Sequence, residues 1–403
     1  MTVSGHPGAF DGPGKPVERR AMGVACGAHA LHDGYTDLVY IMLPIWQHEF
    51  ALGYAALGLM RTVFSGTLAS FQIPSTFLAE RLGPALVLAL GTALAGFGYC
   101  VSGLSQGVPL LVAALFIAGL GASTQHPIAS SLIAHVFSGR RSLKALGTYN
   151  FAGDLGKMTV PALASLMFVV LPWREAVAML GGVGILVGVV IFVLMPRLAA
   201  VTDDTRKAGD VARGAGAPRY GFPLLLSVGM IDSATRMAFL TFLPFVLTAK
   251  GASLPTVGMA LTLVFAGGAA GKLVCAFIGA RIGAVATVWL TETVTALSIV
   301  CLLPLPLDAA LVLLPVVGVA LNGTSSVLYG SVPDLVEPAW RGRAFGIFYT
   351  GTIGAGAVSP ALYGLLGDAL GVPPTLMVVS AVVLFTLPLT LVLRPALLAA
   401  RLT

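Results

Sequence analysis

Apolar residues fall into runs of about 20 to 28 residues, separated by short polar or proline-containing stretches. Each run is long enough to cross a membrane as a helix with some tilt. The pattern therefore predicts twelve membrane-spanning helices. The predicted spans are 21–46, 55–78, 84–104, 108–136, 145–170, 175–196, 220–248, 255–278, 284–304, 309–335, 343–366 and 373–394.

The longest interruption, residues 197–219, is rich in Ala, Gly and charged residues and predicts a cytoplasmic linker. It separates an N-terminal six-helix bundle, 21–196, from a C-terminal six-helix bundle, 220–394. Residues 1–20 are polar and lack the apolar core of a signal peptide, so we expect a disordered tail. Residues 395–403 form a second cytoplasmic tail.

Composition supports the membrane assignment, because only 10% of the residues are charged and 57% are hydrophobic, whereas soluble chains carry about 25% charged residues. The four cysteines lie inside apolar runs, which favours free thiols over disulfides or a metal site. No segment resembles a nucleotide-binding loop, so we expect no cofactor and no ATP-driven step.

Lysine and arginine are distributed unequally between the two sides of the predicted bundle. Of the 23, 17 fall in the tails and loops on the side of the termini, and only Arg174 and Lys250 fall on the other side. Positive charge marks the cytoplasmic side, so both termini are expected in the cytoplasm of a bacterial cell, with the chain in the inner membrane. The net charge of +6 is then an insertion signal, and we infer no nucleic-acid partner.

An internal repeat relates the two halves. Lys144-Ala-Leu-Gly147 recurs as Arg343-Ala-Phe-Gly346, and Asp33 recurs as Asp232, both at an offset of 199 residues. Parallel repeats of this kind are typical of transporters that bind their substrate near the membrane midplane. We therefore expect an all-α polytopic membrane protein made of two pseudo-symmetric six-helix bundles.

Two cytoplasmic segments resemble the major facilitator superfamily. Leu78-Ala-Glu-Arg-Leu-Gly83 is similar to the loop signature after span two, although Thr76 and Pro84 replace the usual Gly and basic residue. Pro333-Asp334, followed by Arg341-Gly-Arg343, resembles the motif after span ten. The resemblance implies that a latch joins the halves in the outward-facing state. Its members would be Glu80, Arg81, Asp334 and Arg341.

Within the superfamily, two further segments resemble the fosmidomycin-resistance type of exporter. They are His29-Ala-Leu-His-Asp33 in span one and Gly119-Leu-Gly-Ala-Ser-Thr-Gln-His-Pro127 in span four. The resemblance implies proton-coupled efflux of a small compound, with anions as a candidate class.

Ionisable residues inside the spans are the candidates for binding protons and substrate. A charge at the bilayer centre costs about 2.5–3.5 kcal/mol on insertion scales, so each such residue needs a partner or an aqueous cavity. The candidates for proton coupling are Asp33, Asp154 and Asp232. The candidates for substrate binding are His29, Asp37, Tyr40, Arg61, Gln125, His126, Lys157, Arg236, Lys272 and Asn322.

Span one carries the most polar face. His29, Asp33 and Asp37 are spaced four residues apart and share that face. Asp33 is near mid-span, where a carboxyl can exchange a proton as access alternates; the alternative is a permanently paired structural carboxylate. His29 and His32 beside Asp33 form only a weak metal signal, and we expect no metal site.

Arg61 in span two has a depth similar to that of Asp37 and is predicted to pair with it. Arg61 would then either bind an anionic substrate group or lock spans one and two. In span five, Asp154 and Lys157 are three residues apart. The repeat does not require them, because their counterparts are Ile353 and Gly356.

Span seven places Asp232 and Arg236 four residues apart, close enough to neutralise each other. Glu292 lies on the peripheral span nine and is expected to be structural or an oligomer contact. In span four, Pro127 predicts a kink beside Gln125 and His126. His126 could bind substrate or titrate, or it could be a satisfied packing residue.

These features predict a secondary active transporter that works by alternating access, with proton-coupled export of a small compound as the leading function. The alternative is uptake or exchange of an organic anion, with Arg61, Lys157 or Lys272 binding the anion. A membrane sensor or an intramembrane enzyme fits less well, because no catalytic set is present. The expected partners are the substrate, protons and the lipid bilayer, and we expect a monomer.

Overall fold

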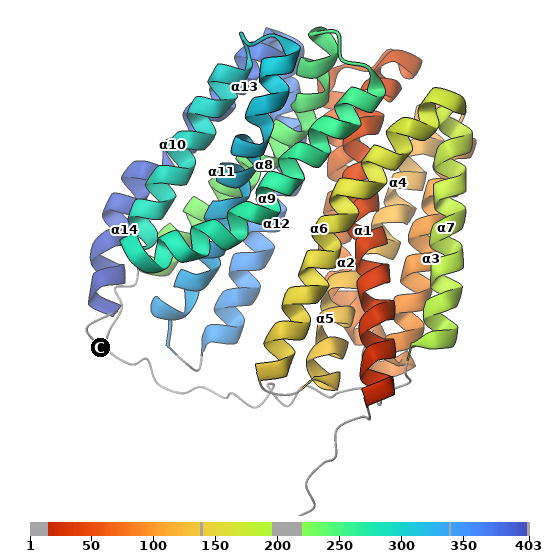
Figure 1. Ribbon diagram of the computed structural model, residues 1–403, viewed down its shortest axis with the longest axis horizontal. Helices are drawn as coiled ribbons and strands as arrows, with labels where there is room; N and C mark the ends of the chain where they lie inside the picture. The colour runs from red at the N-terminus through yellow and green to blue at the C-terminus, as the bar shows by residue number, and fades with distance from the viewer. Residues whose placement is uncertain (1–14, 138–139, 196–219, 338–339, 401–403) are drawn as a thin grey trace, which may run out of the picture.

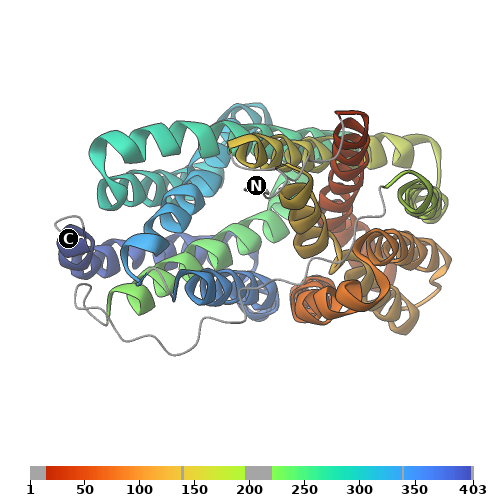
Figure 2. The same cartoon turned by 90° about the horizontal axis from the view of Figure 1, so that it is seen from below.

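A computed structural model describes residues 15–137, 140–195, 220–337 and 340–400. In these ranges the regular structure is helical and no strand occurs. The helices form two bundles that lie side by side (Figures 1 and 2). The predicted fold class is therefore confirmed.

The first six predicted spans correspond to seven helices in the first bundle. They are α1 (Lys15–Phe50), α2 (Tyr54–Leu82), α3 (Pro84–Leu104), α4 (Val108–Ala122), α5 (Gln125–Val136), α6 (Arg140–Val170) and α7 (Trp173–Leu194). The fourth span is broken at Ser123 and Thr124, so it comprises both α4 and α5. Pro127 lies in the first turn of α5, where its missing N–H removes no helical hydrogen bond.

The second bundle follows the same plan. Its elements are α8 (Gly221–Ala249), α9 (Leu254–Ile282), α10 (Ala284–Leu302), α11 (Leu307–Ser331), the 3₁₀ turn η2 (Val332–Asp334), α12 (Arg341–Leu370), α13 (Val372–Val383) and α14 (Thr386–Ala400). The last span is also broken, at Leu384 and Phe385, with Pro388 in the first turn of α14.

The predicted tails are shorter than expected, because both terminal helices are longer than their apolar cores. Helix α1 begins at Lys15, and α14 ends at Ala400, so residues 15–20 and 395–400 are helical. Residues 1–14 and the predicted linker 197–219 lie outside the described residues.

Ten segments among the described residues are long and apolar enough to cross a membrane, and α1 and α2 are not among them. Helix α1 is instead enclosed by protein, since the side chains from Leu38 to Leu43 are all fully buried. Large apolar side chains are exposed on the outer helices, for example Leu104 on α3 and Val170 on α6. The polar face of α1 therefore contacts protein, and the apolar outer surface is suited to lipid.

The two halves meet along matching pairs of helices, α2 with α12 and α6 with α9. The Thr62 hydroxyl donates to the Ala357 carbonyl at 2.7 Å, and the Thr262 hydroxyl donates to the Met158 carbonyl at 2.8 Å. The residues of these two hydrogen bonds are related by the repeat offset, to within one position. The same pseudo-symmetric contact therefore closes both edges of the interface.

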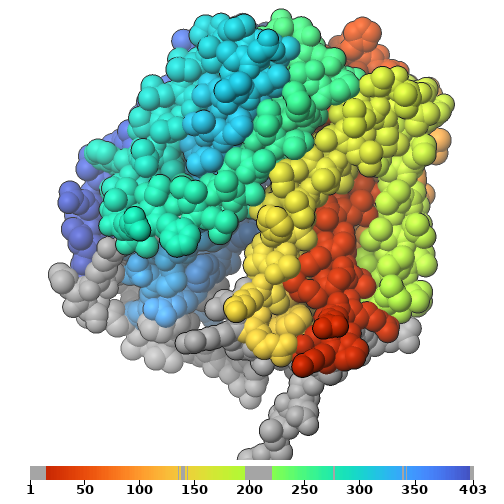
Figure 3. All heavy atoms as spheres, in the orientation of Figure 1, coloured from red at the N-terminus to blue at the C-terminus, as the bar shows by residue number. Residues whose placement is uncertain are grey.

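Close approach at this interface depends on small residues. A Cβ atom on Gly58 would lie 2.1 Å from the Pro360 carbonyl oxygen of the other half. At the end of α12, Asp368 accepts hydrogen bonds from the backbone N–H groups of Tyr54 and Ala55, at 2.6 and 3.0 Å. These contacts lie on the side of the molecule away from the start of α1, and the halves separate toward the side where α1 starts (Figures 1 and 3).

The four residues of the predicted latch lie on the separated side. Glu80, Arg81, Asp334 and Arg341 are all exposed, and no hydrogen bond or ion pair joins them to one another in the described ranges. The latch was expected to join the halves only in the outward-facing state, so the lack of contact between its residues here does not conflict with that expectation. Its role stays a prediction.

Candidate functional site: a caged carboxylate at the centre of the first bundle

Asp33 lies at the centre of α1 within a cluster of basic side chains. Its Oδ1 atom is 3.3 Å from Nε2 of His29, 3.8 Å from Nε2 of His32 and 3.7 Å from Nε2 of His126. Its Oδ2 atom is 3.4 Å from the Lys157 ammonium. The Asp33 side chain is only 8% exposed, so these groups replace water around a carboxyl group in the membrane interior.

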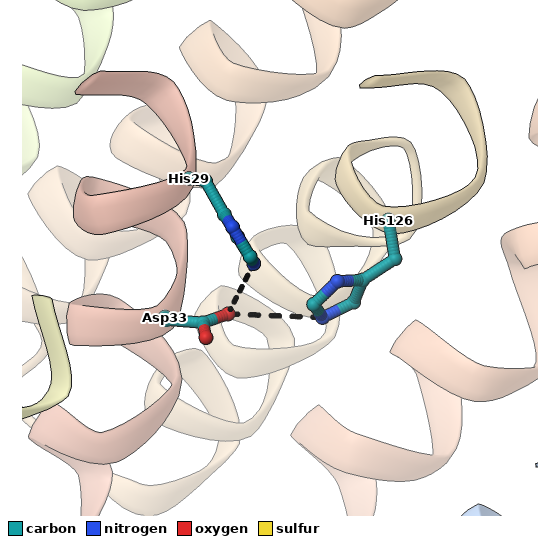
Figure 4. A group of neighbouring side chains, drawn as sticks. All are labelled: His29, Asp33 and His126. Atoms are coloured by element: carbon teal, nitrogen blue, oxygen red, sulfur yellow. Dashed lines mark ion pairs between the residues drawn. The ribbon is translucent and has the colours of Figure 1, made fainter. Parts of the chain in front are cut away.

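Three helices bring the cluster together. His29 and Asp33 are one turn apart on α1, and the break between α4 and α5 aims the His126 ring at the same carboxyl oxygen (Figure 4). Helix α6 approaches closely because it has Gly153 and Gly156 at the contact. A Cβ atom on Gly153 would lie 2.6 Å from Asp33 Oδ2, and one on Gly156 would lie 1.8 Å from the Ala30 carbonyl oxygen.

Tyr149 is a member of the site that the sequence analysis missed. Its ring stacks on His29 with 3.9 Å between ring centroids, and its carbonyl oxygen is 2.8 Å from His29 Nδ1. A carbonyl can only accept, so Nδ1 donates and the Nε2 atom of His29 is directed toward Asp33. The spacing of Tyr149 and Gly153 on α6, four residues apart on one face, was the available signal.

Asp154 and Lys157 do not pair with each other, although they are three residues apart on α6. Lys157 contacts Asp33 within the first half, whereas Asp154 accepts from Lys272 of α9 at 2.6 and 2.8 Å. Asp154 therefore joins the two halves, through α6 and α9. The side chains of His126, Lys157 and Lys272 are 32%, 31% and 39% exposed, so this cluster is open on one side.

The predicted ion pair between Asp37 and Arg61 is wrong for this conformation, since none forms within 4.0 Å among the described residues. Arg61 instead donates to the Tyr40 hydroxyl at 3.1 Å and lies over the Tyr40 ring, 4.6 Å from its centroid. The Tyr40 hydroxyl contacts Met237 Sδ of the second half at 3.1 Å. Arg61 is only 2% exposed, so its guanidinium is closed off from substrate here.

Of the two interpretations of Glu292, the oligomer contact is wrong and the structural role fits, because the residue is buried within its own half. Its side chain is 1% exposed and shares a hydrogen bond with Asp232, with Thr324 as a further partner. No ion pair forms between Asp232 and Arg236 within the described ranges. An ionised carboxylate can only accept hydrogen bonds, so a hydrogen bond between Asp232 and Glu292 requires that one of the two carries a proton.

Two amide candidates serve the packing of their own half. The Gln125 side-chain amide is 3.5 Å from the Tyr149 hydroxyl, next to the Asp33 cluster. The Asn322 amide donates to the Gly318 carbonyl, one turn earlier on α11, at 3.2 Å. Asp33 and its basic neighbours are thus the largest convergence of predicted site residues.

Comparison with known proteins supports the fold over nearly the whole chain. The chain is 27% identical over 384 residues to a probable sulfoacetate transporter of Cupriavidus necator, covering 87% of each protein. It is 24% identical over 355 residues to the fosmidomycin resistance protein of Escherichia coli, covering 86% of each. Among solved structures, a bacterial homolog of the human lysosomal transporter Spinster, inward-facing and unoccupied, superposes with a TM-score of 0.77 at 15% identity, covering 96% of this chain and 98% of that one.

The model of the Major Facilitator Superfamily matches residues 25–227 and again residues 225–401. The two matches divide the chain near the predicted boundary between its halves. Together they span both bundles and every helix that contributes to the Asp33 cluster. The chain therefore belongs to the Major Facilitator Superfamily, and it is a multi-pass membrane transporter rather than an enzyme.

Proposed function

We propose that this transporter moves a small organic anion together with a proton, and that the Asp33–Lys157 ion pair couples the two. The observation that carries the proposal is the 3.4 Å contact between the Asp33 carboxylate and the Lys157 ammonium. In this pair each charge is neutralised by the other. While the pair is intact, Asp33 is not free to take a proton and Lys157 is not free to bind an anion.

Breaking the pair makes both groups available at once. A proton on Asp33 removes the negative charge that holds Lys157, and the ammonium can then bind an anion. By linkage, an anion on Lys157 favours protonation of Asp33 to the same extent. Positive coupling between proton and anion is the signature of symport, which the inward proton gradient of a bacterial inner membrane would direct toward uptake.

The surroundings of the pair favour an anionic substrate. Lys157, Lys272 and His126 are the partly exposed members of the cluster. One of the relatives is a probable sulfoacetate transporter, and sulfoacetate carries a sulfonate and a carboxylate. With both termini in the cytoplasm, the separated side of the molecule is the cytoplasmic side, and the conformation is inward-facing.

Proton-coupled export remains the second candidate, because a specific observation favours it. The fosmidomycin resistance protein is similar over 86% of both chains, and fosmidomycin is a small phosphonate. Export by antiport requires that proton and substrate compete for one site. The shared cluster would serve this function if the substrate contacted Asp33 itself.

Flux in proteoliposomes separates the two directions, with radiolabelled sulfoacetate as the first probe. Symport predicts that acidifying the outside drives accumulation, whereas antiport predicts that it drives loss from preloaded vesicles. If sulfoacetate does not bind, a thermal-shift screen of anionic metabolites supplies the probe, since a ligand of the folded state raises its stability.

Two variants test the coupling. Asp33→Asn should keep exchange of labelled for unlabelled anion and lose accumulation driven by the pH gradient. Lys157→Gln should lose both, because the anion loses its ammonium. Asp308→Asn is the matched control, since Asp308 is exposed at the start of α11. Undiminished pH-driven accumulation in Asp33→Asn would refute the proposed coupling.

A further inference from the structure

Three imidazole nitrogens converge on one carboxyl oxygen in the Asp33 cluster. Nε2 of His29, His32 and His126 all lie within 3.8 Å of Asp33 Oδ1. The ligand atoms of His29, Asp33 and His126 are within 4.8 Å of one another. Figure 4 shows the rings of His29 and His126 turned toward the same oxygen from two different helices.

Two of these three nitrogens, on His29 and His32, have no partner in hydrogen-bonding geometry among the described residues. Nε2 of His29 and Nε2 of His32 are buried and have no hydrogen-bond partner in the described ranges, and the two residues are only 2% and 7% exposed. The Nδ1 atom of His29 already donates to the Tyr149 carbonyl. In the neutral ring, Nε2 therefore carries a lone pair that faces a carboxylate oxygen. Two such electron-rich atoms lie stably side by side when a cation is between them, either a proton on Nε2 or a metal ion.

We propose that His29, Asp33 and His126 form a binding site for a divalent transition-metal ion such as Zn²⁺, with His32 as an additional nitrogen donor. Imidazole and carboxylate are the ligands that zinc takes in three-ligand sites, with bond lengths of about 2.0–2.1 Å. Donors of a tetrahedral zinc site are then about 3.3 Å apart. The distance from His29 Nε2 to Asp33 Oδ1 is already 3.3 Å, and the distance from His126 Nε2 is 3.7 Å.

The second coordination shell and the access route also fit. A metal-bound histidine normally donates its other N–H to a carbonyl or carboxylate, as His29 does to Tyr149. His29 and His32 are buried, whereas the His126 side chain is 32% exposed. An ion could therefore enter past His126. The ligand atoms of His29 and His126 lie within 4.8 Å of each other, so the two rings would have to move together around the ion to reach the donor spacing of about 3.3 Å.

Lys157 opposes the metal and gives the proposal a specific test. Its ammonium is 3.4 Å from Asp33 Oδ2, on the other oxygen of the same carboxylate. A positive charge at this distance repels a divalent ion. Replacing Lys157 with the uncharged Met should therefore tighten metal binding, an effect that a merely structural histidine cluster does not predict.

The experiment is an equilibrium titration of the purified full-length chain in lipid nanodiscs, with the affinity tag removed. Zn²⁺ alone is the probe, in competition with a chromophoric chelator. Cobalt(II) in a second titration reports tetrahedral coordination by its visible absorption. We expect one equivalent of zinc, and about a 100-fold loss of affinity or more in the His29→Ala/His126→Ala double variant, since even outer-shell changes cost 10–100-fold.

His48→Ala is the matched control, because His48 is exposed near the end of α1; it should bind zinc as the unmodified chain does. Zinc binding that is absent, or that is the same in the double variant, would overturn the proposal. If the double variant does not fold, Lys157→Met decides the matter, and unchanged affinity in that variant overturns the proposal as well. No substrate or flux is involved, so the outcome is independent of the proposed transport function.

Discussion

The contact between Asp368 and the start of α2 should set the balance between the two conformations of the transporter. Asp368 belongs to α12 of the second half, and its carboxylate caps the first N–H groups of a first-half helix at 2.6 and 3.0 Å. Helix N-termini stabilise anions, and the first N–H groups have no partner within the helix. The contact exists only while the halves meet on this side, so its free energy acts directly on the conformational equilibrium.

The magnitude follows from the kind of contact. Replacing a capping Asp by Ala costs about 0.5–2 kcal/mol, and hydrogen bonds to a charged group contribute about 1.5–3 kcal/mol. Asp368 is exposed, so screening favours the lower part of this range, about 1–2 kcal/mol. Asp368→Ala should therefore shift the equilibrium by about 5- to 30-fold toward the conformation in which this side is open.

Distances between spin labels measure the shift. Leu82 on α2 and Phe345 on α12 are exposed near the separated side, one in each half, and carry the labels in a variant without native cysteines. Asp368→Ala should increase the short-distance population. Asp308→Ala is the control, because Asp308 is an exposed acidic residue in the first turn of α11. An unchanged distance distribution in Asp368→Ala, or an equal shift in the control, would refute the reasoning.

Three further predictions concern packing and pairing. Gly156→Ala should destabilise the chain by about 1–3 kcal/mol through overpacking, and so lower its thermal unfolding midpoint, because a Cβ atom there would lie 1.8 Å from the Ala30 carbonyl oxygen. Gly147→Ala should leave the midpoint unchanged, because a Cβ atom at Gly147 would have no neighbour within 4 Å. Thr62→Val and Thr262→Val should each shift the label distances in the same direction as Asp368→Ala, by about 0.5–1.5 kcal/mol, with additive effects in the double variant. Glu292→Leu should destabilise the chain by about 1–3 kcal/mol in a thermal melt by leaving Asp232 unpaired, and Glu292→Gln should not, because it keeps a hydrogen-bonding group there.

Most of the fold could be predicted from the sequence because lipid imposes a simple rule. A crossing that faces lipid needs an apolar run of about 20 residues, and such runs are detectable in the sequence. Helices α1 and α2 are less apolar than the other ten spans, and they were predicted from the same pattern. The ends of α1 and α14 were predicted less well, because helical hydrogen bonding continues beyond the apolar core into polar residues such as Lys15 to Arg20. The break before Pro127 was predicted as a kink, whereas the break before Pro388 was not predicted.

Partners within the site could not be predicted so well, because periodicity locates residues along one helix and not across helices. Asp154 and Lys157 share a helix, yet each pairs with another one, α9 and α1 respectively. Arg61 was predicted to pair with Asp37, but its guanidinium donates to the Tyr40 hydroxyl instead. These outcomes depend on the rotation of helices about their axes, which tertiary packing decides.

The internal repeat separates the machinery of movement from the chemistry. Thr62 and Thr262 make equivalent hydrogen bonds on the two edges of the interface, so the moving contact is preserved in both copies. The basic neighbours of Asp33 are not preserved. His29, His32, His126 and Lys157 correspond to Val228, Ile231, Ser325 and Gly356 in the second half. Only the carboxylate itself recurs, as Asp232, and there it pairs with another acid instead of with bases. A symmetric interface beside an asymmetric charge cluster is what our two proposals require: the halves would move alike, while only the first half would exchange its carboxylate between a proton, an ammonium and a metal ion.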